Sequence, residues 1–173
     1  MDFIVESALQ NMPEENFENM SQANIKVIGV GGAGNNMVGW LYKKGIKGAE
    51  IIATNTDHQH LGITGADRKF LIGKDCTRGL GCGGYPSKGA EAAQESMAML
   101  KESLKLSDMV FVCAGMGGGT GTGAAPVVAQ VAKDTGSIVI GTVTMPFSIE
   151  KARCDKAEFG LQQLRQVCDT VIV

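Results

Sequence analysis

The segment Gly117–Gly123 consists only of glycine and threonine, the residue types best suited to binding an anion through the backbone. Glycine lets several N–H groups approach one anion, and a helix N-terminus adds partial positive charge. The apolar stretch 108–113 before it predicts a strand, and 126–133 predicts a helix with Pro126 in its first turn. A simple turn needs only one or two glycines. We therefore interpret this segment as a phosphate-binding loop.

A second pattern, G-x-G-x-x-G, is formed by Gly29, Gly31 and Gly34 between a predicted strand and a predicted helix. This arrangement is typical of a dinucleotide-binding turn, and Asp57 stands where an acid that contacts ribose is expected. A third glycine cluster lies at 78–84. The sequence has no G-x-x-x-x-G-K-[ST] motif, which excludes a P-loop.

Short apolar runs, which predict strands, alternate along the chain with segments whose apolar residues recur at helical spacing. These strands and helices must position the glycine-rich segments. The predicted strands are 25–30, 51–53, 70–72, 108–113, 138–143 and 170–173, and the predicted helices are 37–44, 87–106, 126–133 and 150–167. The alternation predicts an α/β fold: a Rossmann-like, doubly wound, mostly parallel sheet of about six strands with helices on both faces. The glycine-rich loops at 31–36, 77–86 and 117–123 should then converge at the carboxyl edge of the sheet.

Composition narrows the class of protein. The chain has 173 residues, 44% of them hydrophobic, which is enough for one domain with a core. A net charge of −2 without a long basic run argues against nucleic acid, and no apolar run approaches the length of a membrane span. The five cysteines include no C-x-x-C pair, so we interpret them as reduced thiols in the cytoplasm.

Residues 1–23 are predicted to be an extension that precedes a domain at 24–173. One helical face of the extension carries Ile4, Val5, Ala8, Leu9 and Met12, so it is either a short helix or a partly disordered arm.

Two histidines, His58 and His60, follow the second predicted strand in a polar loop. Without a third ligand, they are more typical of solvent-facing residues than of a metal site. Asp57, beside them, is interpreted as orienting the loop rather than as catalytic.

The segment Gly117–Gly123, followed by Ala124-Ala125-Pro126, resembles the signature loop of the tubulin/FtsZ family, on its FtsZ branch. Four further segments match the family in order. Residues 27–36 resemble its first phosphate loop, 55–59 its second, 77–83 its γ-phosphate-sensing loop and 146–153 its ribose-contacting segment. The similarity covers about residues 24–173 and implies a GTP-binding domain with the fold predicted above.

The resemblance assigns a set of residues to GTP or GDP, and the two main loops in that set carry no lysine. Backbone N–H groups, helix N-termini and Mg²⁺ should therefore stabilise the phosphates. The Mg²⁺ ion should be held mainly by phosphate oxygens and water, with Gln59 as a candidate for orienting one water. The assigned residues are Gly31, Gly32, Ala33, Gly34, Asn35, Asn36, Asn55, Asp57, Gly81, Cys82, Gly83, Gly117, Gly118, Gly119, Thr120, Gly121, Thr122, Pro146, Glu150 and Arg153.

The ribose-contacting segment departs from the family pattern in two ways, and milder departures are Tyr85, where asparagine is common, and Cys82, where alanine is common. Lys151 stands where a glycine usually follows the glutamate that Glu150 matches. The family's arginine falls on Cys154 when counted from Glu150 but on Arg153 when counted back from Gly160. A one-residue deletion reconciles the two counts, and we favour Arg153.

The resemblance further implies a cytoplasmic GTPase at the division site that assembles head to tail into filaments, with cell-division proteins as partners. The family's guanine-recognising helix and catalytic acids have no counterpart up to Val173. We therefore expect an amino-terminal half with no catalytic residue of its own, whose site is completed by the next subunit. Two alternatives are an NAD-dependent oxidoreductase and a non-catalytic relative that only binds nucleotide.

Overall fold

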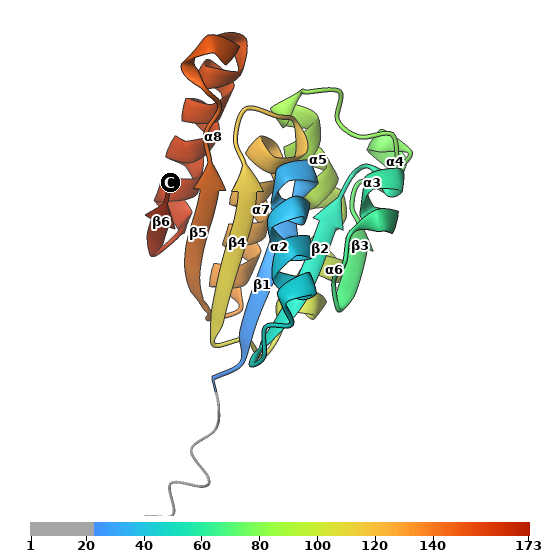
Figure 1. Ribbon diagram of the computed structural model, residues 1–173, viewed down its shortest axis with the longest axis vertical. Helices are drawn as coiled ribbons and strands as arrows, with labels where there is room; N and C mark the ends of the chain where they lie inside the picture. Colours follow the sequence, from blue (N-terminus) through green and yellow to red (C-terminus); the bar gives the residue numbers. More distant parts are fainter. Residues whose placement is uncertain (1–22) are drawn as a thin grey trace, which may run out of the picture.

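The computed structural model describes residues 23–173, which form one six-stranded sheet with helices on both faces (Figure 1). The extension predicted at the N-terminus lies almost entirely outside these residues. Every neighbouring pair of strands is parallel, and the order is β3-β2-β1-β4-β5-β6. This confirms the predicted doubly wound sheet. The strands are β1 (Ile25–Val30), β2 (Ala49–Asn55), β3 (Arg68–Leu71), β4 (Met109–Gly115), β5 (Ile138–Thr144) and β6 (Thr170–Ile172).

Helix α2 (Gly31–Lys44) covers one face of the sheet, and α7 (Thr120–Asp134) covers the other (Figure 1). Around α7 pack α5 (Pro86–Glu95), α6 (Met97–Leu104) and α8 (Ala152–Val167). The remaining short helices are α3 (His58–Ile63), α4 (Lys74–Thr77) and the 3-10 turn η2 (Ser148–Glu150).

The alternation of side chains along β1 divides the core into two layers. Val27 packs with Val38 of α2, whereas the next residue, Ile28, belongs to the larger cluster that contains Val128 of α7. Successive residues of a strand point to opposite faces, so an uninterrupted apolar strand fills both layers. This explains why the central strands read as continuous hydrophobic runs.

Glycines set the spacing between α7 and its neighbouring helices. A Cβ at Gly123 would collide with the carbonyl oxygen of Pro86, and one at Gly89 would collide with that of Gly119. A Cβ at Gly160 of α8 would likewise overlap the side chain of Thr122. The absence of side chains at these positions lets the three helices pack closely, and this fixes the N-terminus of α7 against α5 and α8.

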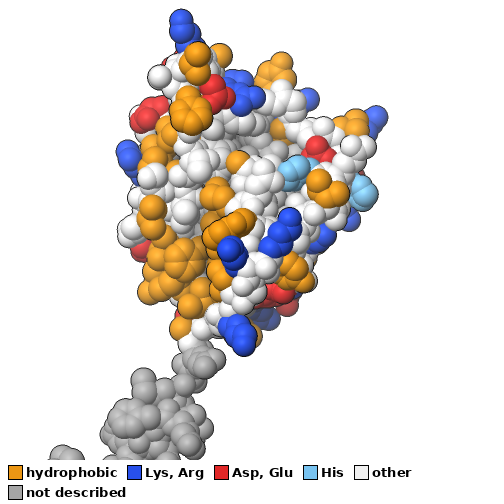
Figure 2. All heavy atoms as spheres, viewed as in Figure 1, with side chains coloured by type: hydrophobic (Ala, Val, Ile, Leu, Met, Phe, Trp, Pro, Cys, Tyr) orange, Lys and Arg blue, Asp and Glu red, His pale blue; other side chains and the backbone are white. Residues whose placement is uncertain are grey.

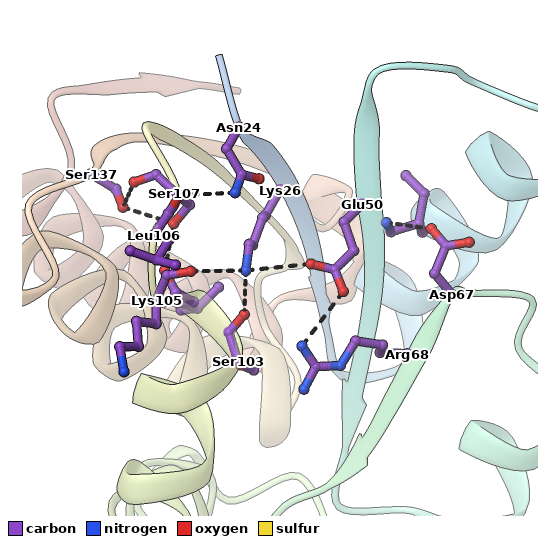
Figure 3. A network of polar contacts seen from close by, with 12 residues as sticks. Asn24, Lys26, Glu50, Asp67, Arg68, Ser103, Lys105, Leu106, Ser107 and Ser137 are labelled. Carbon is purple, nitrogen blue, oxygen red and sulfur yellow. Dashed lines mark hydrogen bonds and ion pairs between the residues drawn. The ribbon is translucent and has the colours of Figure 1, made fainter. Parts of the chain in front are cut away.

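A buried lysine ties the amino edge of the sheet to the end of α6 (Figure 3). Lys26 Nζ donates to Ser103 O at 2.8 Å and to Lys105 O at 3.1 Å, and lies 3.4 Å from Glu50 Oε2. Its charge thus meets the carbonyl end of a helix, where a cation is stabilised. Glu50 also pairs with Arg68 of β3. The network lies at the edge of the sheet opposite to the one where glycine-rich loops were predicted.

Several predicted boundaries were wrong. The helix predicted at 87–106 is two helices, since Ser96 leaves helical geometry and its hydroxyl accepts from Gly73 N at 3.0 Å. The helix predicted at 150–167 begins at Ala152, after η2. The polar loop predicted around the two histidines is helix α3.

Candidate functional site

The carboxyl ends of β1 and β4 flank the point where the connections change direction. The chain leaves β1 into α2 on one face of the sheet and leaves β4 toward α7 on the other. In doubly wound sheets, ligands bind in the crevice at such a point. The N-termini of α2 and α7 meet there, since a Cβ on Gly31 would lie 2.8 Å from Gly121 N.

Both glycine-rich segments are shorter as loops than the sequence predicted. Residues 31–36 were expected to form a loop, but α2 begins at Gly31, directly after β1. Helix α7 begins at Thr120, so Pro126 lies inside the helix and not in its first turn. The compact geometry is the physical reason, because Gly31 has φ of +73° and turns the chain from strand to helix in one residue.

A cavity of about 370 Å³ lies at this edge of the sheet. It brings together residues from the start of α2, the 115–121 segment and the region that begins at the end of β5. Most of the predicted site segments therefore share one cavity. Its lining residues are Gly32, Ala33, Gly115, Met116, Gly118, Gly119, Thr120, Gly121, Thr144, Met145, Pro146, Glu150 and Arg153.

The walls of this cavity suit an anion that is held by backbone groups. The first N–H groups of a helix have no partner within the helix, and the helix dipole makes that end positive. Neither α2 nor α7 has an acidic residue in its first turn. Arg153 is the only cationic side chain among the lining residues. Two helix N-termini therefore supply most of the positive potential for phosphates.

The Glu150 carboxylate gives the other end of the cavity a different chemistry. Its Oε1 accepts from Phe147 N at 3.1 Å, and its Oε2 lies 2.9 Å from Arg153 Nη1. A carboxylate that is oriented in this way can accept hydrogen bonds from hydroxyl groups such as those of ribose. Of the two residues considered for the arginine position, Arg153 lines the cavity, whereas Cys154 Sγ donates to Phe147 O at 3.5 Å.

Thr120 connects the cavity wall to two other segments. Its Oγ1 lies 2.8 Å from Thr56 Oγ1 and donates to Cys82 Sγ at 3.5 Å, and Cys82 Sγ donates to Thr56 Oγ1 at 3.4 Å. These three contacts join the residue after β2, the start of α7 and the segment between α4 and α5. We call this last segment, residues 78–85, the 78–85 loop. Thr120 therefore has one side on the cavity and the other on this polar cluster.

The second threonine of the segment has an internal role. Thr122 is buried, and its Oγ1 accepts from Gly117 N at 2.9 Å. This bond closes the turn in which Gly117 has φ of +96°. Thr122 thus shapes the cavity wall, and its hydroxyl is engaged by the protein itself.

Gly119 was assigned to the phosphates and packs tightly, but its backbone is not left-handed. Its φ and ψ are −83° and −63°, which other residues also adopt. A Cβ there would lie 2.7 Å from Cys82 Cβ and 3.0 Å from Tyr85 N. The 78–85 loop therefore requires glycine at this position for steric reasons.

Two of the three asparagines assigned to GTP, Asn35 and Asn55, support the backbone in this structure. Asn35 is fully buried, and its amide nitrogen, oriented to satisfy its neighbours, donates to Gly29 O at 3.0 Å and to Thr54 O at 3.3 Å. Asn55 Oδ1 accepts from Thr56 N at 2.9 Å. Asn36 is exposed on α2. None of the three lines the cavity.

Asp57 caps helix α3, because its Oδ1 accepts from His60 N at 3.0 Å. This matches the prediction that Asp57 orients its own segment. Gln59 follows in α3 and is exposed. Between residues 23 and 173, no group of three or more His, Cys, Asp or Glu side chains is placed to bind a metal.

The 78–85 loop borders the cavity without lining it. Gly81 and Gly83 have φ of +82° and +58°, and Gly81 N donates to Thr56 O at 3.0 Å. Cys82, between them, is buried in the cluster with Thr120. The loop is therefore in contact with two residues of the cavity wall, Thr120 and Gly119.

The structure adds residues that the sequence-based prediction missed. Gly115, Met116, Thr144 and Met145 line the cavity at the carboxyl ends of β4 and β5. Their position after predicted strands was the available signal. Behind the site, burial raises the pKa of the Cys113 thiol to about 11, so this thiol is neutral at ordinary pH. Among the described helices, none is long and apolar enough to cross a membrane.

Comparisons with known proteins agree with this geometry. The FtsZ 2 cell division protein of Methanocaldococcus jannaschii is 57% identical over 156 residues, which are 90% of this chain and 41% of that protein. FtsZ 1 of Archaeoglobus fulgidus is 59% identical over 150 residues, 86% of this chain and 41% of that protein. The chain thus spans less than half the length of these relatives.

Solved structures give the same result. The empty FtsZ dimer of M. jannaschii has a TM-score of 0.85 and 47% identity, over 98% of this chain and 47% of that one. CetZ2 from Haloferax volcanii, a GTPγS-bound protofilament, has a TM-score of 0.77 and 27% identity, over 86% and 48% of the two chains. The model of the "Tubulin/FtsZ family, GTPase domain" matches residues 24–173. By sequence and by fold, the chain belongs to the tubulin/FtsZ family.

Proposed function

We propose that this chain forms the nucleotide-binding domain of a GTPase that assembles head to tail into filaments during cell division. The observation that carries the proposal is the cavity between the N-termini of α2 and α7, which has glycine backbone on one side and Glu150 with Arg153 on the other. Such a cavity fits a nucleotide whose phosphates lie against helix N-termini and whose ribose faces a carboxylate.

In this proposal, Gly32, Gly118 and Gly121 present backbone N–H groups to the phosphates, and Thr120 adds a hydroxyl. Glu150 accepts from the ribose, and Arg153 lies beside it. The 78–85 loop, with Gly81, Cys82 and Gly83, senses the last phosphate through its contact with Thr120. Of the other residues assigned by resemblance, Ala33, Gly119 and Pro146 also line the cavity, whereas Asn35, Asn55 and Thr122 stabilise these segments from behind.

The described residues offer few groups to hold a cation. Mg²⁺ is therefore proposed to be bound mainly by phosphate oxygens and water, which fits its preference for keeping several waters. Gln59 on α3 remains the candidate for orienting one of these waters. The ion would neutralise phosphate charge that a lysine neutralises in P-loop proteins.

Hydrolysis is proposed to take place at a composite site. Glu150 is the only acid among the residues that line the cavity, and its carboxylate is held by Phe147 N and Arg153, so it is assigned to the ribose and not to an attacking water. A neighbouring copy would supply the missing acids on assembly. The chain would act in the cytoplasm at the division site, with itself and other cell-division proteins as partners, and residues 24–173 would be the functional domain.

The test uses the full-length protein. Calorimetry should give binding of GTP and GDP with no comparable binding of NAD, and GTP turnover per molecule should rise with protein concentration as filaments form. Preferential binding of NAD would favour the oxidoreductase alternative and refute the proposal. GTP turnover that does not depend on protein concentration would contradict the composite site while leaving nucleotide binding intact.

A further inference from the structure

A groove of about 310 Å³ separates α2 from α3 on the face of the sheet that Figure 2 shows. Helix α2 lines one side of the groove, and α3 with the residues after it lines the other. The lining residues are Asn35, Asn36, Gly39, Trp40, Lys43, His60, Ile63, Thr64 and Gly65. Trp40 is 60% exposed and Ile63 is 85% exposed. Large apolar side chains that gather along a groove mark a surface that another segment covers.

Lysines surround the lower end of this groove. Lys43 and Lys44 form the last turn of α2, and Lys47 follows in the turn to β2. All three are exposed, and no ion pair within residues 23–173 involves them. Figure 2 shows basic and hydrophobic side chains close together over the lower part of α2. The groove thus carries two exposed apolar side chains, Trp40 and Ile63, with lysines near one end, and the Lys44 ammonium lies 5.1 Å from the centroid of the Trp40 ring.

The N-terminal segment 1–22 has the complementary chemistry. It contains five carboxylates, Asp2, Glu6, Glu14, Glu15 and Glu18, and neither lysine nor arginine. It also contains an apolar stripe, Ile4, Val5, Ala8, Leu9 and Met12, at helical spacing. Both features that the groove exposes, an apolar surface and uncompensated positive charge, therefore have a counterpart in this one segment.

The fold places the attachment point of this segment beside the groove. The segment joins the sheet at Asn24, whose backbone N–H and side-chain amide donate to Asp108 Oδ2 at 2.7 Å and to Leu106 O at 2.9 Å. Ile25 pairs with Ala49 in the sheet, and Lys47 stands two residues before Ala49. The chain therefore leaves the domain next to the basic turn.

Length permits the segment to reach the whole groove. As a helix, 22 residues span about 33 Å, and an extended chain spans about 70 Å. The part of α2 between Lys43 and Asn36 is only about 10 Å long. Because both partners belong to one chain, the segment acts at a high effective concentration, so a modest contact is enough.

We propose that residues 1–22 bind in the α2–α3 groove, with their apolar stripe on Trp40 and Ile63 and their carboxylates near Lys43, Lys44 and Lys47. The contact is intramolecular and covers an otherwise exposed hydrophobic surface. Asn35 and Asn36, which were assigned to GTP, line the far end of this groove, but Trp40, Ile63 and the three lysines do not line the nucleotide cavity, so the proposal does not depend on nucleotide binding.

Trp40 is the only tryptophan in the sequence, which makes it a direct reporter of this contact. Acrylamide quenching of its fluorescence should be measured in the chain 1–173 and in a chain that begins at Ala23. We expect quenching to rise about twofold on truncation, with a red-shifted emission, because an apolar cover has been removed. A synthetic peptide with the sequence of residues 1–22 should restore the shielding.

Lys43→Glu with Lys47→Glu tests the charge contribution in a chain that can still fold. In the whole chain it should raise quenching as much as truncation does, and in the truncated chain it should have no effect. Lys101→Glu, an exposed lysine of α6, should change neither value. Equal quenching in the whole and truncated chains would overturn the proposal. Shielding that depends on protein concentration would also overturn it, because the groove would then be covered by a second copy.

Discussion

The hydroxyl of Thr120 links the cavity to the polar cluster behind it, and Thr120→Val removes that hydroxyl while keeping the shape of the side chain. Two contacts disappear: the one to Thr56 Oγ1 at 2.8 Å and the one to Cys82 Sγ at 3.5 Å. Thr56 is fully buried, so its hydroxyl cannot turn to water for a replacement. The substitution should therefore lower the stability of the fold. Because Thr120 also lines the cavity, the substitution should in addition weaken nucleotide binding.

The two effects differ in origin and can be estimated separately. Without nucleotide, the loss of these two neutral contacts inside the protein should lower the free energy of unfolding by about 1–2 kcal/mol. With nucleotide, the loss of a hydroxyl that donates to a charged phosphate should weaken binding by about 1–3 kcal/mol. This second cost corresponds to a Kd that is roughly five- to 150-fold higher.

Calorimetric titration of the full-length protein with GTP and GDP measures the second effect, and urea unfolding measures the first. Thr142→Val is the matched control, since Thr142 lies on β5 and does not line the cavity. It should leave the affinity unchanged. If Thr120→Val lowers the stability but leaves the affinity for both nucleotides unchanged, the hydroxyl only joins the three segments, and its assignment to the phosphates is refuted.

Three further substitutions test other parts of the structure. Gly123→Ala should lower the free energy of unfolding in urea by about 1–3 kcal/mol, because its Cβ would collide with Pro86 O and push α5 from α7. A Cβ on Gly62 in α3 would have no neighbouring atom within 4 Å, so Gly62→Ala should not destabilise the protein. If the two substitutions lowered the free energy of unfolding equally, close packing at Gly123 would be contradicted. Glu150→Gln should weaken GTP binding in calorimetry, since the carboxylate lies on the cavity wall; an unchanged Kd would exclude Glu150 from ribose binding. The Lys133 ammonium beside Asp169, with Val139 N–H, lowers the pKa of that carboxyl below its ordinary value. Because this pKa is lower in the folded chain than in the unfolded chain, the contacts stabilise the fold above the ordinary pKa and are lost as the pH falls through the lowered one. Asp169→Asn should therefore lower the free energy of unfolding at neutral pH and make it fall less steeply as the pH is lowered, as measured by urea unfolding at several pH values. If the free energy of unfolding fell as steeply as in the unchanged chain, other groups would be responsible for the acid sensitivity.

The sequence alone was sufficient to predict the sheet. The runs at 25–30 and 138–143 are apolar apart from Lys26 and Thr142, and a strand covered on both faces fits such a run when helices alternate with it. The glycine and threonine types of the segment Gly117–Gly123 likewise led to the prediction of a phosphate-binding loop. Both properties depend on local chemistry that each residue carries into any fold.

Only the tertiary structure decided where the helices begin and which side chains face the cavity. Thr120 and Thr122 are two residues apart in the same motif, yet one lines the cavity and the other is bonded to Gly117 N. Asn35, predicted to contact nucleotide, is turned inward to the ends of β1 and β2. Helix rotation and the close approach of Gly123 to α5 determine these directions, and they depend on contacts between residues far apart in the chain. A motif therefore specified which chemistry is present, and long-range packing determined which of its groups are available to a ligand.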